Sequence, residues 1–248
     1  MAEFKIAAAQ IASVRGDITG NIRAHAAAIE AAAKRAVSVL VFPELSLIGY
    51  EPDLAAELAI AATDERLAPL AALALRHRMD VVVGAALRNG ARKPALGAIL
   101  FAADGSTHTY SKMHLGSSEV AYFAPGGAPL SFATCGQTIG IAICADASEP
   151  SHPQAYAAAG STVYAASVFL NAEWFATDSP RLAEYASRFR MLVVMANHAA
   201  SVGSFVSVGR SAVWSPNGTR LAEAAGTENC LVTASRVREA WHGELIPV

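Results

Sequence analysis

Three residues with complementary chemistry each follow a predicted strand. Glu44 comes directly after "VLVFP", Lys112 after "THTYS" and Cys144 after "TIGIAI". Strand ends in α/β sheets are where active sites are usually assembled, because the loops there can aim side chains at a common cavity. A carboxylate can take a thiol proton, a thiolate can attack an electrophilic carbon, and an ammonium can stabilise the oxyanion that forms. Together the three residues indicate nucleophilic catalysis by a cysteine.

Each residue taken alone has a simpler explanation. A cysteine at the end of an apolar run is commonly a small hydrophobic side chain that completes a buried strand. A glutamate after a proline is commonly a capping or solvated carboxylate, and a lysine at a strand end commonly extends its charge into solvent. The catalytic interpretation therefore depends on the three residues acting as a set.

The elements that must position these residues alternate along the chain as β-branched runs and alanine-rich helical stretches, which predicts an α/β layered domain. We expect strands over residues 4–11, 38–44, 80–87, 96–102, 107–112, 130–134, 138–144, 162–167, 192–196, 211–215 and 230–235. We expect one helix capped by Asp17 or Thr19 and ending near residues 34–35, and others over 65–78, 150–159 and 180–190. No repeat, linker or low-complexity segment interrupts this pattern, so we expect a single domain over residues 1–248.

Composition limits the classes of partner. The net charge is -2, 53% of the 248 residues are hydrophobic, and basic residues group only in pairs, which argues against nucleic-acid binding. No apolar run reaches the ~20 residues of a membrane span. The opening "MAEFKIAAAQIAS" is acidic and short where a signal peptide is basic and long. We therefore expect a cytoplasmic protein that binds neither nucleic acid nor membrane.

The cysteines and histidines indicate neither a disulfide framework nor a metal site. Cys135, Cys144 and Cys230 form no close-spaced pair, and the seven histidines are scattered. A G-x-S-x-G elbow, which a serine hydrolase needs, is missing, and so are the glycine-rich motifs of nucleotide-binding enzymes. The sequence thus predicts chemistry that requires no metal and no cofactor.

Three motifs in order resemble those of the nitrilase superfamily of carbon-nitrogen hydrolases, in its amidase-like branch. They are "VFPELSLIGY" around Glu44, "YSKMHL" around Lys112 and "GIAICADASEP" around Cys144. The flanking stretches "IAAAQ", "GDITGN", "FAPGG", "ASRFRMLVVMANHA" and "GRSAVWSPNG" extend the resemblance over residues 4–237, which is nearly the whole chain.

The resemblance implies a four-layer αββα sandwich, with two roughly six-stranded sheets packed face to face, and a homodimer or larger homo-oligomer. It implies that Cys144 attacks the carbon of an amide, nitrile or carbamoyl group, that Glu44 is the general base, and that Lys112 stabilises the oxyanion together with the N–H of Ala145. Glu119 resembles a second glutamate that hydrogen-bonds the catalytic lysine in many members. The alternative for Glu119 is a solvated loop carboxylate.

One departure from the family pattern bears on the substrate. In many members the cysteine begins a pattern like C-Y-D-x-R-F-P-E, which has an arginine four positions after the cysteine. This chain has "CADASEP" there and lacks the arginine. A guanidinium can grip a substrate carboxylate, so its absence favours a neutral or cationic small amide. Candidate pocket walls are Tyr50, Phe123, Glu149 and Trp174, although each aromatic residue could instead be core packing.

The favoured function is hydrolysis of a small amide through a cysteine thioester. The alternatives left open are nitrile or N-carbamoyl hydrolysis, acyl transfer to an amine, and a non-catalytic binding protein that keeps the fold.

Overall fold

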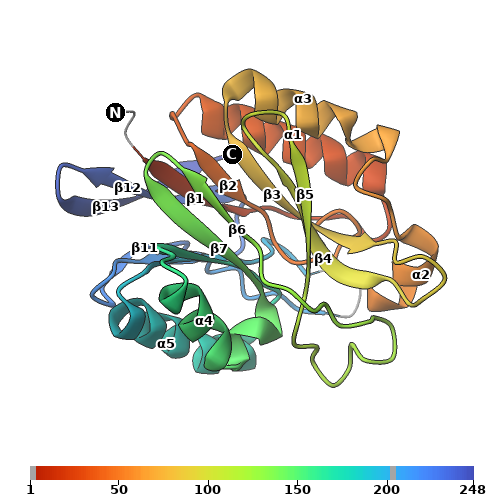
Figure 1. The fold of residues 1–248 in the computed structure, drawn as a ribbon. Helices are drawn as coiled ribbons and strands as arrows, with labels where there is room; N and C mark the ends of the chain where they lie inside the picture. Colours follow the sequence, from red (N-terminus) through yellow and green to blue (C-terminus); the bar gives the residue numbers. More distant parts are fainter. Residues whose placement is uncertain (1–3, 202–204) are drawn as a thin grey trace.

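Two β-sheets lie face to face between two layers of helices in the computed structural model, which describes residues 4–201 and 205–248. Helices α1 (Ile18–Ala33) and α3 (Ala68–His77) cover one sheet, and α4 (Ser151–Ala158) and α5 (Ala172–Phe189) cover the other (Figure 1). The structure thus confirms the predicted four-layer αββα arrangement.

Within the described residues, one sheet has seven strands and the other six, where we expected about six in each. The first has the order β13 (Ala240–Pro247), β12 (Cys230–Val237), β1 (Lys5–Gln10), β2 (Val39–Val41), β3 (Asp80–Leu87), β4 (Ala95–Phe101) and β5 (Thr107–Ser111). The second has the order β11 (Arg220–Glu223), β10 (Ala212–Trp214), β9 (Leu192–Ala196), β8 (Val163–Ser167), β7 (Gln137–Ile143) and β6 (Ser131–Thr134).

Short helical turns occupy the loops. They are η1 (Pro52–Leu54), α2 (Ala55–Leu58), η2 (Glu65–Leu67) and η3 (Cys144–Ser148). No helix in residues 4–201 and 205–248 combines the length and the apolar character needed to cross a membrane.

Side-chain alternation along β9 explains the layering. Leu192, Val194 and Ala196 point into the core between the sheets, whereas Val193 and Met195 belong to the core under α4 and α5. A strand that is covered on both faces needs an apolar residue at every position, and β9 has one. The run "LVVMA" is therefore a central strand of the sandwich.

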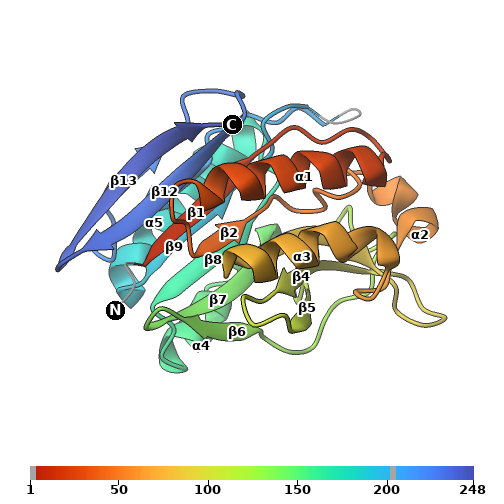
Figure 2. The ribbon, with the colours of Figure 1, turned by 90° about the horizontal axis from the view of Figure 1, so that it is seen from above.

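Two parts of the predicted secondary structure were wrong. Helix α5 begins at Ala172, eight residues earlier than expected, with the side chain of Asn171 accepting the N–H of Trp174, and Pro180 lies inside it instead of starting it. Strands β11 and β13 were missed. Strand β11 has only four residues and is mostly half-buried, β13 is largely exposed, and neither shows a clear apolar alternation. Figure 2 shows that the β12–β13 hairpin forms the outer edge of its sheet.

The topology brings the three candidate residues to one end of the sandwich. Strands β2 and β3 are parallel, and β5 runs in the same direction because two antiparallel pairings separate it from β3. Glu44 lies in the loop after β2, and Lys112 directly follows β5. Cys144 directly follows β7 in the other sheet. Residues of both sheets therefore build the site.

Candidate active site

The loop that carries Glu44 is held by backbone contacts and is buried. The Leu47 N–H donates to the Gly84 carbonyl at 3.0 Å, and Nε2 of His198 donates to the Glu44 carbonyl at 2.7 Å. Burial lowers the pKa of His198 to about 4, so the ring is neutral near pH 7 and Nε2 carries its proton. These contacts orient the Glu44 backbone from both sheets.

A buried polar network connects the same loop to helix α1 and to the segment before it. His25 Nε2 lies 2.9 Å from Ser46 Oγ, and Asn21 Nδ2 donates to the Leu47 carbonyl at 3.0 Å. Ser13 Oγ donates to the Ser46 carbonyl at 2.9 Å. Buried polar groups that are satisfied in this way restrict a loop to one conformation.

Gly84 of β3 is required by the close approach of the Glu44 loop. A Cβ at this position would lie 2.2 Å from the Pro43 carbonyl oxygen and 2.6 Å from the Leu45 nitrogen. Gly84→Ala should therefore displace the loop, reduce stability by ~1–3 kcal/mol as overpacking typically does, and lower kcat. Urea unfolding and amide turnover measure the two effects.

Gly127→Ala is the matched control for Gly84→Ala, because a Cβ there meets no atom within 4 Å and the residue is exposed. It should leave both stability and kcat close to the wild-type values. A fully active, fully stable Gly84→Ala protein would contradict the role assigned to this glycine.

Lys112 joins two buried carboxylates. Its Nζ lies 2.7 Å from Glu44 Oε1 and 2.8 Å from each carboxylate oxygen of Glu119. Glu119 also accepts from the Tyr50 hydroxyl at 3.0 Å and from the Gly116 N–H at 2.7 Å. Glu119 is buried, which argues against the solvated-loop alternative. All four side chains form one hydrogen-bonded group.

The charges in this group set the proton affinity of Glu44. Burial raises its pKa to about 7, the positive charge of Lys112 works against the shift, and the negative charge of Glu119 adds to it. For Lys112, burial disfavours the ammonium, but the negative charges of Glu44 and Glu119 outweigh burial and raise its pKa. Lys112 is thus a permanent cation beside a carboxyl group that exchanges its proton near neutral pH.

Cys144 is placed at a sharp turn directly after β7. Its backbone φ is +42°, in the left-handed region that few non-glycine residues adopt, and its Sγ lies 3.9 Å from the Phe169 carbonyl oxygen. Burial raises the pKa of the thiol well above its usual value, the charge of Glu44 adds to this, and Lys112 opposes it. The thiol is therefore protonated at rest and needs a base.

Glu44 can supply that base. Its Oε1 is bound by Lys112, while its Oε2 is buried without a hydrogen-bond partner among the described residues. Ala145 is the second residue of the helical turn η3, where the first N–H groups have no acceptor within the turn. The arrangement therefore combines a thiol, a proton acceptor, a fixed cation and a backbone N–H.

A cavity of about 560 Å³ lies beside this group. Tyr50 forms part of its wall, and its ring stacks on Phe169 with the ring centroids 4.6 Å apart. The other lining residues are Pro52, Ser118, Tyr122 and Phe205, together with the charged Arg15, Glu51 and Asp53. Because Tyr50 also bonds Glu119, it belongs both to the cavity wall and to the carboxylate–lysine group, although Glu44, Lys112 and Cys144 do not line the cavity.

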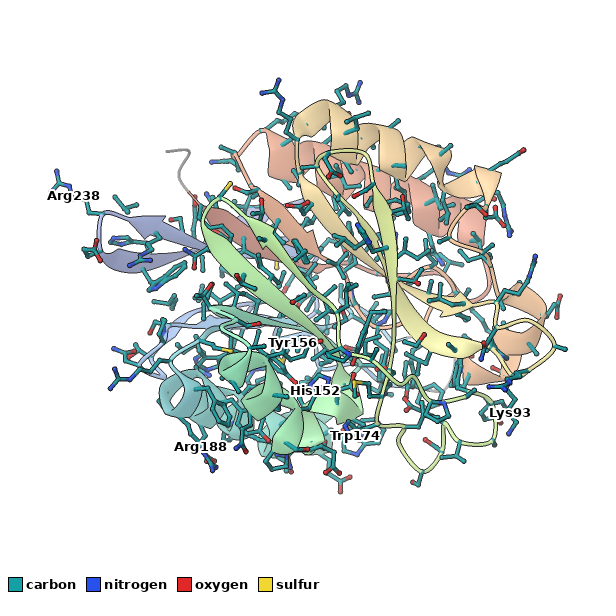
Figure 3. All side chains as sticks on the ribbon, viewed as in Figure 1. Lys93, His152, Tyr156, Trp174, Arg188 and Arg238 are labelled. Atoms are coloured by element: carbon teal, nitrogen blue, oxygen red, sulfur yellow. The ribbon has the colours of Figure 1, made fainter. Side chains whose placement is uncertain are left out.

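The other predicted pocket walls lie elsewhere. Phe123 is buried among the core side chains, which favours the core alternative. Glu149 is exposed at the end of η3, and Trp174 is exposed in the α4–α5 layer, where Figure 3 labels it. Tyr50 is the one of the four that lines this cavity, and a substrate contact by any of them stays a prediction.

Two buried residues at the site were assigned no role from the sequence, Asp146 and His198. Asp146 bonds backbone groups next to both Lys112 and Cys144, and His198 bonds the Glu44 backbone. The sequence does contain a signal for a role at each position. Asp146 is an acidic residue between two alanines, two positions after the cysteine that follows a strand. His198 lies two residues after the buried strand β9, where a polar side chain can reach the site.

Among the described residues, no cluster of three or more histidine, cysteine, aspartate or glutamate side chains is arranged to hold a metal ion. The sequence profile of the carbon-nitrogen hydrolase family matches residues 5–242. The chain belongs to this family. A comparison of this carbon-nitrogen hydrolase with curated protein sequences finds no match.

Solved structures of an amidase from Nesterenkonia sp. resemble the hydrolase closely in fold. A crystal structure of that amidase is 25% identical, with a TM-score of 0.86 over 95% of this chain and 91% of that chain. A mutant of the Nesterenkonia sp. AN1 amidase in complex with butyramide is 24% identical, with a TM-score of 0.87 over 96% of this chain and 92% of that one. Another mutant shows Michael addition of acrylamide at the active-site cysteine, at 24% identity and a TM-score of 0.85 over 93% of this chain and 92% of that one.

The family match and these neighbours agree with the expected superfamily and fold. The hydrolase is an amidase-like carbon-nitrogen hydrolase of the nitrilase superfamily.

Proposed function

We propose that this enzyme hydrolyses the carbon-nitrogen bond of a small amide through a thioester on Cys144. The observation that carries the proposal is the buried group in which Lys112 binds Oε1 of Glu44 while Oε2 of Glu44 has no partner among the described residues. The amides acrylamide and butyramide bound by the Nesterenkonia amidase support an amide as the substrate class.

In the first half of the reaction, Glu44 Oε2 accepts the thiol proton of Cys144 while Sγ bonds to the amide carbon. The carbonyl oxygen becomes an oxyanion that the Lys112 ammonium and the Ala145 N–H stabilise, which is worth roughly 3–4 kcal/mol per donor in comparable sites. Glu44 then gives its proton to the nitrogen, the carbon–nitrogen bond breaks, and the amine leaves. The acyl group remains bonded to Cys144 Sγ as a thioester, and Glu44 is again a carboxylate.

In the second half, Glu44 accepts a proton from water while the water oxygen attacks the thioester carbon. The same donors stabilise the second oxyanion, the Sγ–C bond breaks, and the proton returns to Cys144 as the carboxylic acid leaves. Glu119 and Tyr50 do not exchange protons in this scheme. They hold the Lys112 ammonium in place through the contacts at 2.8 and 3.0 Å.

The charges that line the cavity support a neutral or cationic amide. Arg15 is the cationic residue of the cavity wall, but it is paired with both Glu51 and Asp53. Its guanidinium is thus already neutralised, and a substrate carboxylate would have to compete with two carboxylates of the protein.

The test is ammonia release from acetamide, butyramide and acrylamide by the wild-type protein, beside a nitrile and an N-carbamoyl amino acid. We expect turnover of the amides and a mass increase on the peptide that contains Cys144 when the acyl-enzyme is trapped with acid. Turnover of the nitrile or the carbamoyl compound alone would overturn the amide proposal. Absence of both turnover and adduct for every compound would favour a binding protein.

The pH dependence of kcat/KM should show the proton affinity of Glu44. Below a pH of about 7 Glu44 is protonated and cannot accept the thiol proton, so kcat/KM should rise as the pH increases through about 7. Initial rates of ammonia release between about pH 5 and pH 9 measure this, with a thermal-unfolding check that the protein stays folded across the range. A flat profile would contradict the assignment.

The single domain over residues 1–248, the cytoplasmic location and the homodimeric or larger assembly stay predictions from the sequence.

A further inference from the structure

We propose that Asp146 is a positioning residue that sets the place of Cys144 relative to Lys112. The inference rests on the proposed function and adds a residue to it. Asp146 is fully buried, and its Oδ1 accepts the N–H groups of Met113 at 3.0 Å and His114 at 2.8 Å. Its Oδ2 accepts the Ile143 N–H at 3.0 Å and the Tyr110 hydroxyl at 2.7 Å.

These bonds join the two catalytic segments, which belong to different sheets. Met113 and His114 directly follow Lys112 beyond β5, and Ile143 directly precedes Cys144 at the end of β7. Because β5 and β7 lie in separate sheets, no strand ladder fixes one segment against the other. The carboxylate of Asp146 provides that link by accepting backbone donors from both.

A chain of hydrogen bonds holds the carboxylate in turn. The Tyr110 hydroxyl donates to Asp146, so it accepts from His152 Nε2 at 3.0 Å, and His152 Nδ1 accepts from the Tyr164 hydroxyl at 2.9 Å. Burial lowers the pKa of His152, with the negative charge of Asp146 opposing the shift, so the ring is neutral. His152, labelled in Figure 3, lies on α4, and Tyr164 lies on β8. Each proton in the chain has one donor and one acceptor.

An aspartate is specifically required at this position because all four of its partners can donate. Both oxygens of a carboxylate accept, whereas an asparagine amide has one accepting oxygen and one donating nitrogen. In Asp146→Asn the side-chain oxygen is best placed to accept the N–H groups of Met113 and His114. The amide nitrogen, itself a donor, then faces the Ile143 N–H, and this backbone donor is left without an acceptor because it cannot turn away. The substitution should therefore release the Cys144 segment while the Lys112 segment stays held.

The experiment compares Asp146→Asn with Tyr156→Phe. The buried Tyr156 hydroxyl accepts the Leu130 N–H at 3.0 Å and donates to the Ile141 carbonyl at 2.8 Å. Tyr156→Phe therefore costs stability by removing buried hydrogen bonds, but it leaves Asp146 and all four of its partners in place. We expect Asp146→Asn to lower kcat by ~100-fold or more with a nearly unchanged KM, as a displaced nucleophile does, and to slow alkylation of Cys144 by acrylamide. Tyr156→Phe should keep wild-type kcat and alkylation rate despite a similar fall in Tm.

Equal losses of kcat in the two variants, in proportion to their Tm, would overturn the proposal in favour of a purely structural role. Wild-type kcat and alkylation rate in Asp146→Asn would also overturn it. Alkylation is followed by peptide mass spectrometry and needs no substrate. If the wild-type protein hydrolyses no amide, the proposed function fails while the alkylation comparison still decides the role of Asp146.

Hydrogen exchange on the wild-type protein keeps the proposal testable if Asp146→Asn does not fold. The amides of Met113 and His114 lie outside the strands, and Asp146 is their acceptor. We expect both amides to exchange as slowly as those of β5. Exchange at the rate of an open loop would show that Asp146 does not hold this segment.

Discussion

Replacing Cys144 with alanine should abolish amide hydrolysis, because no other group in the site can form the thioester. Loss of a nucleophile in a comparable hydrolase lowers kcat by on the order of 10⁶-fold. The side chain is half-buried at the margin of both core clusters, and its contact with the Phe169 carbonyl at 3.9 Å is weak, so loss of its one sulfur atom should cost little stability. The protein should therefore remain folded. Ammonia release measures the loss of hydrolysis, and the intact-protein mass after incubation with acrylamide measures the loss of the covalent adduct on Cys144.

Cys135→Ala is a close control for Cys144→Ala. Cys135 also adopts a left-handed backbone, with φ of +46° against +42° for Cys144, so the same side-chain change is made on the same kind of backbone. Cys135 is exposed in the turn between β6 and β7. Its alanine variant should keep full activity. An acyl adduct that persists in Cys144→Ala would show that another residue is the nucleophile.

Replacing Glu44 with glutamine should lower kcat by ~10³-fold, because a general base in this role contributes roughly 10²–10⁴-fold. The amide keeps the size of the carboxyl group, and its oxygen can still accept from Lys112. It cannot accept the thiol proton, and it removes the group whose pKa is raised to about 7. The remaining activity should therefore lose the rise in rate through neutral pH. The kcat of ammonia release across the pH range tests both effects.

Glu223→Gln is the control for Glu44→Gln. Glu223 is a half-buried glutamate of β11 that pairs with Arg210 and Arg220, so the variant makes the same chemical change in another ion pair. It should keep the wild-type kcat and pH profile. Unchanged ammonia release in Glu44→Gln would exclude Glu44 as the base.

Local patterns were sufficient to predict most of the strands. The runs over Asp80–Leu87 and Leu192–Ala196 were predicted to the residue because every position in them is buried and, apart from Asp80, apolar. Strand β13 was not predicted, since its partner β12 supplies the hydrogen bonds while most of its side chains are exposed. Helix α5 was predicted eight residues too short because a proline inside a helix resembles a proline that starts one.

The presence of Glu44, Lys112 and Cys144 at strand ends was readable from the sequence, because a strand and the residue that ends it are adjacent in the chain. The role of Asp146 was not readable, because its partners Met113 and His114 are 33 and 32 residues away and become neighbours only when the two sheets pack. The same holds for His198, which bonds the Glu44 backbone across 154 residues.

The sequence alone thus determined which groups are available for chemistry and in what order along the chain they occur. Only the tertiary structure decided their proton affinities and orientation. A pKa depends on burial and on charges brought near from other elements, as the pairing of Glu44 with Lys112 across 68 residues illustrates. Backbone donors likewise find a distant carboxylate only after the sandwich has closed.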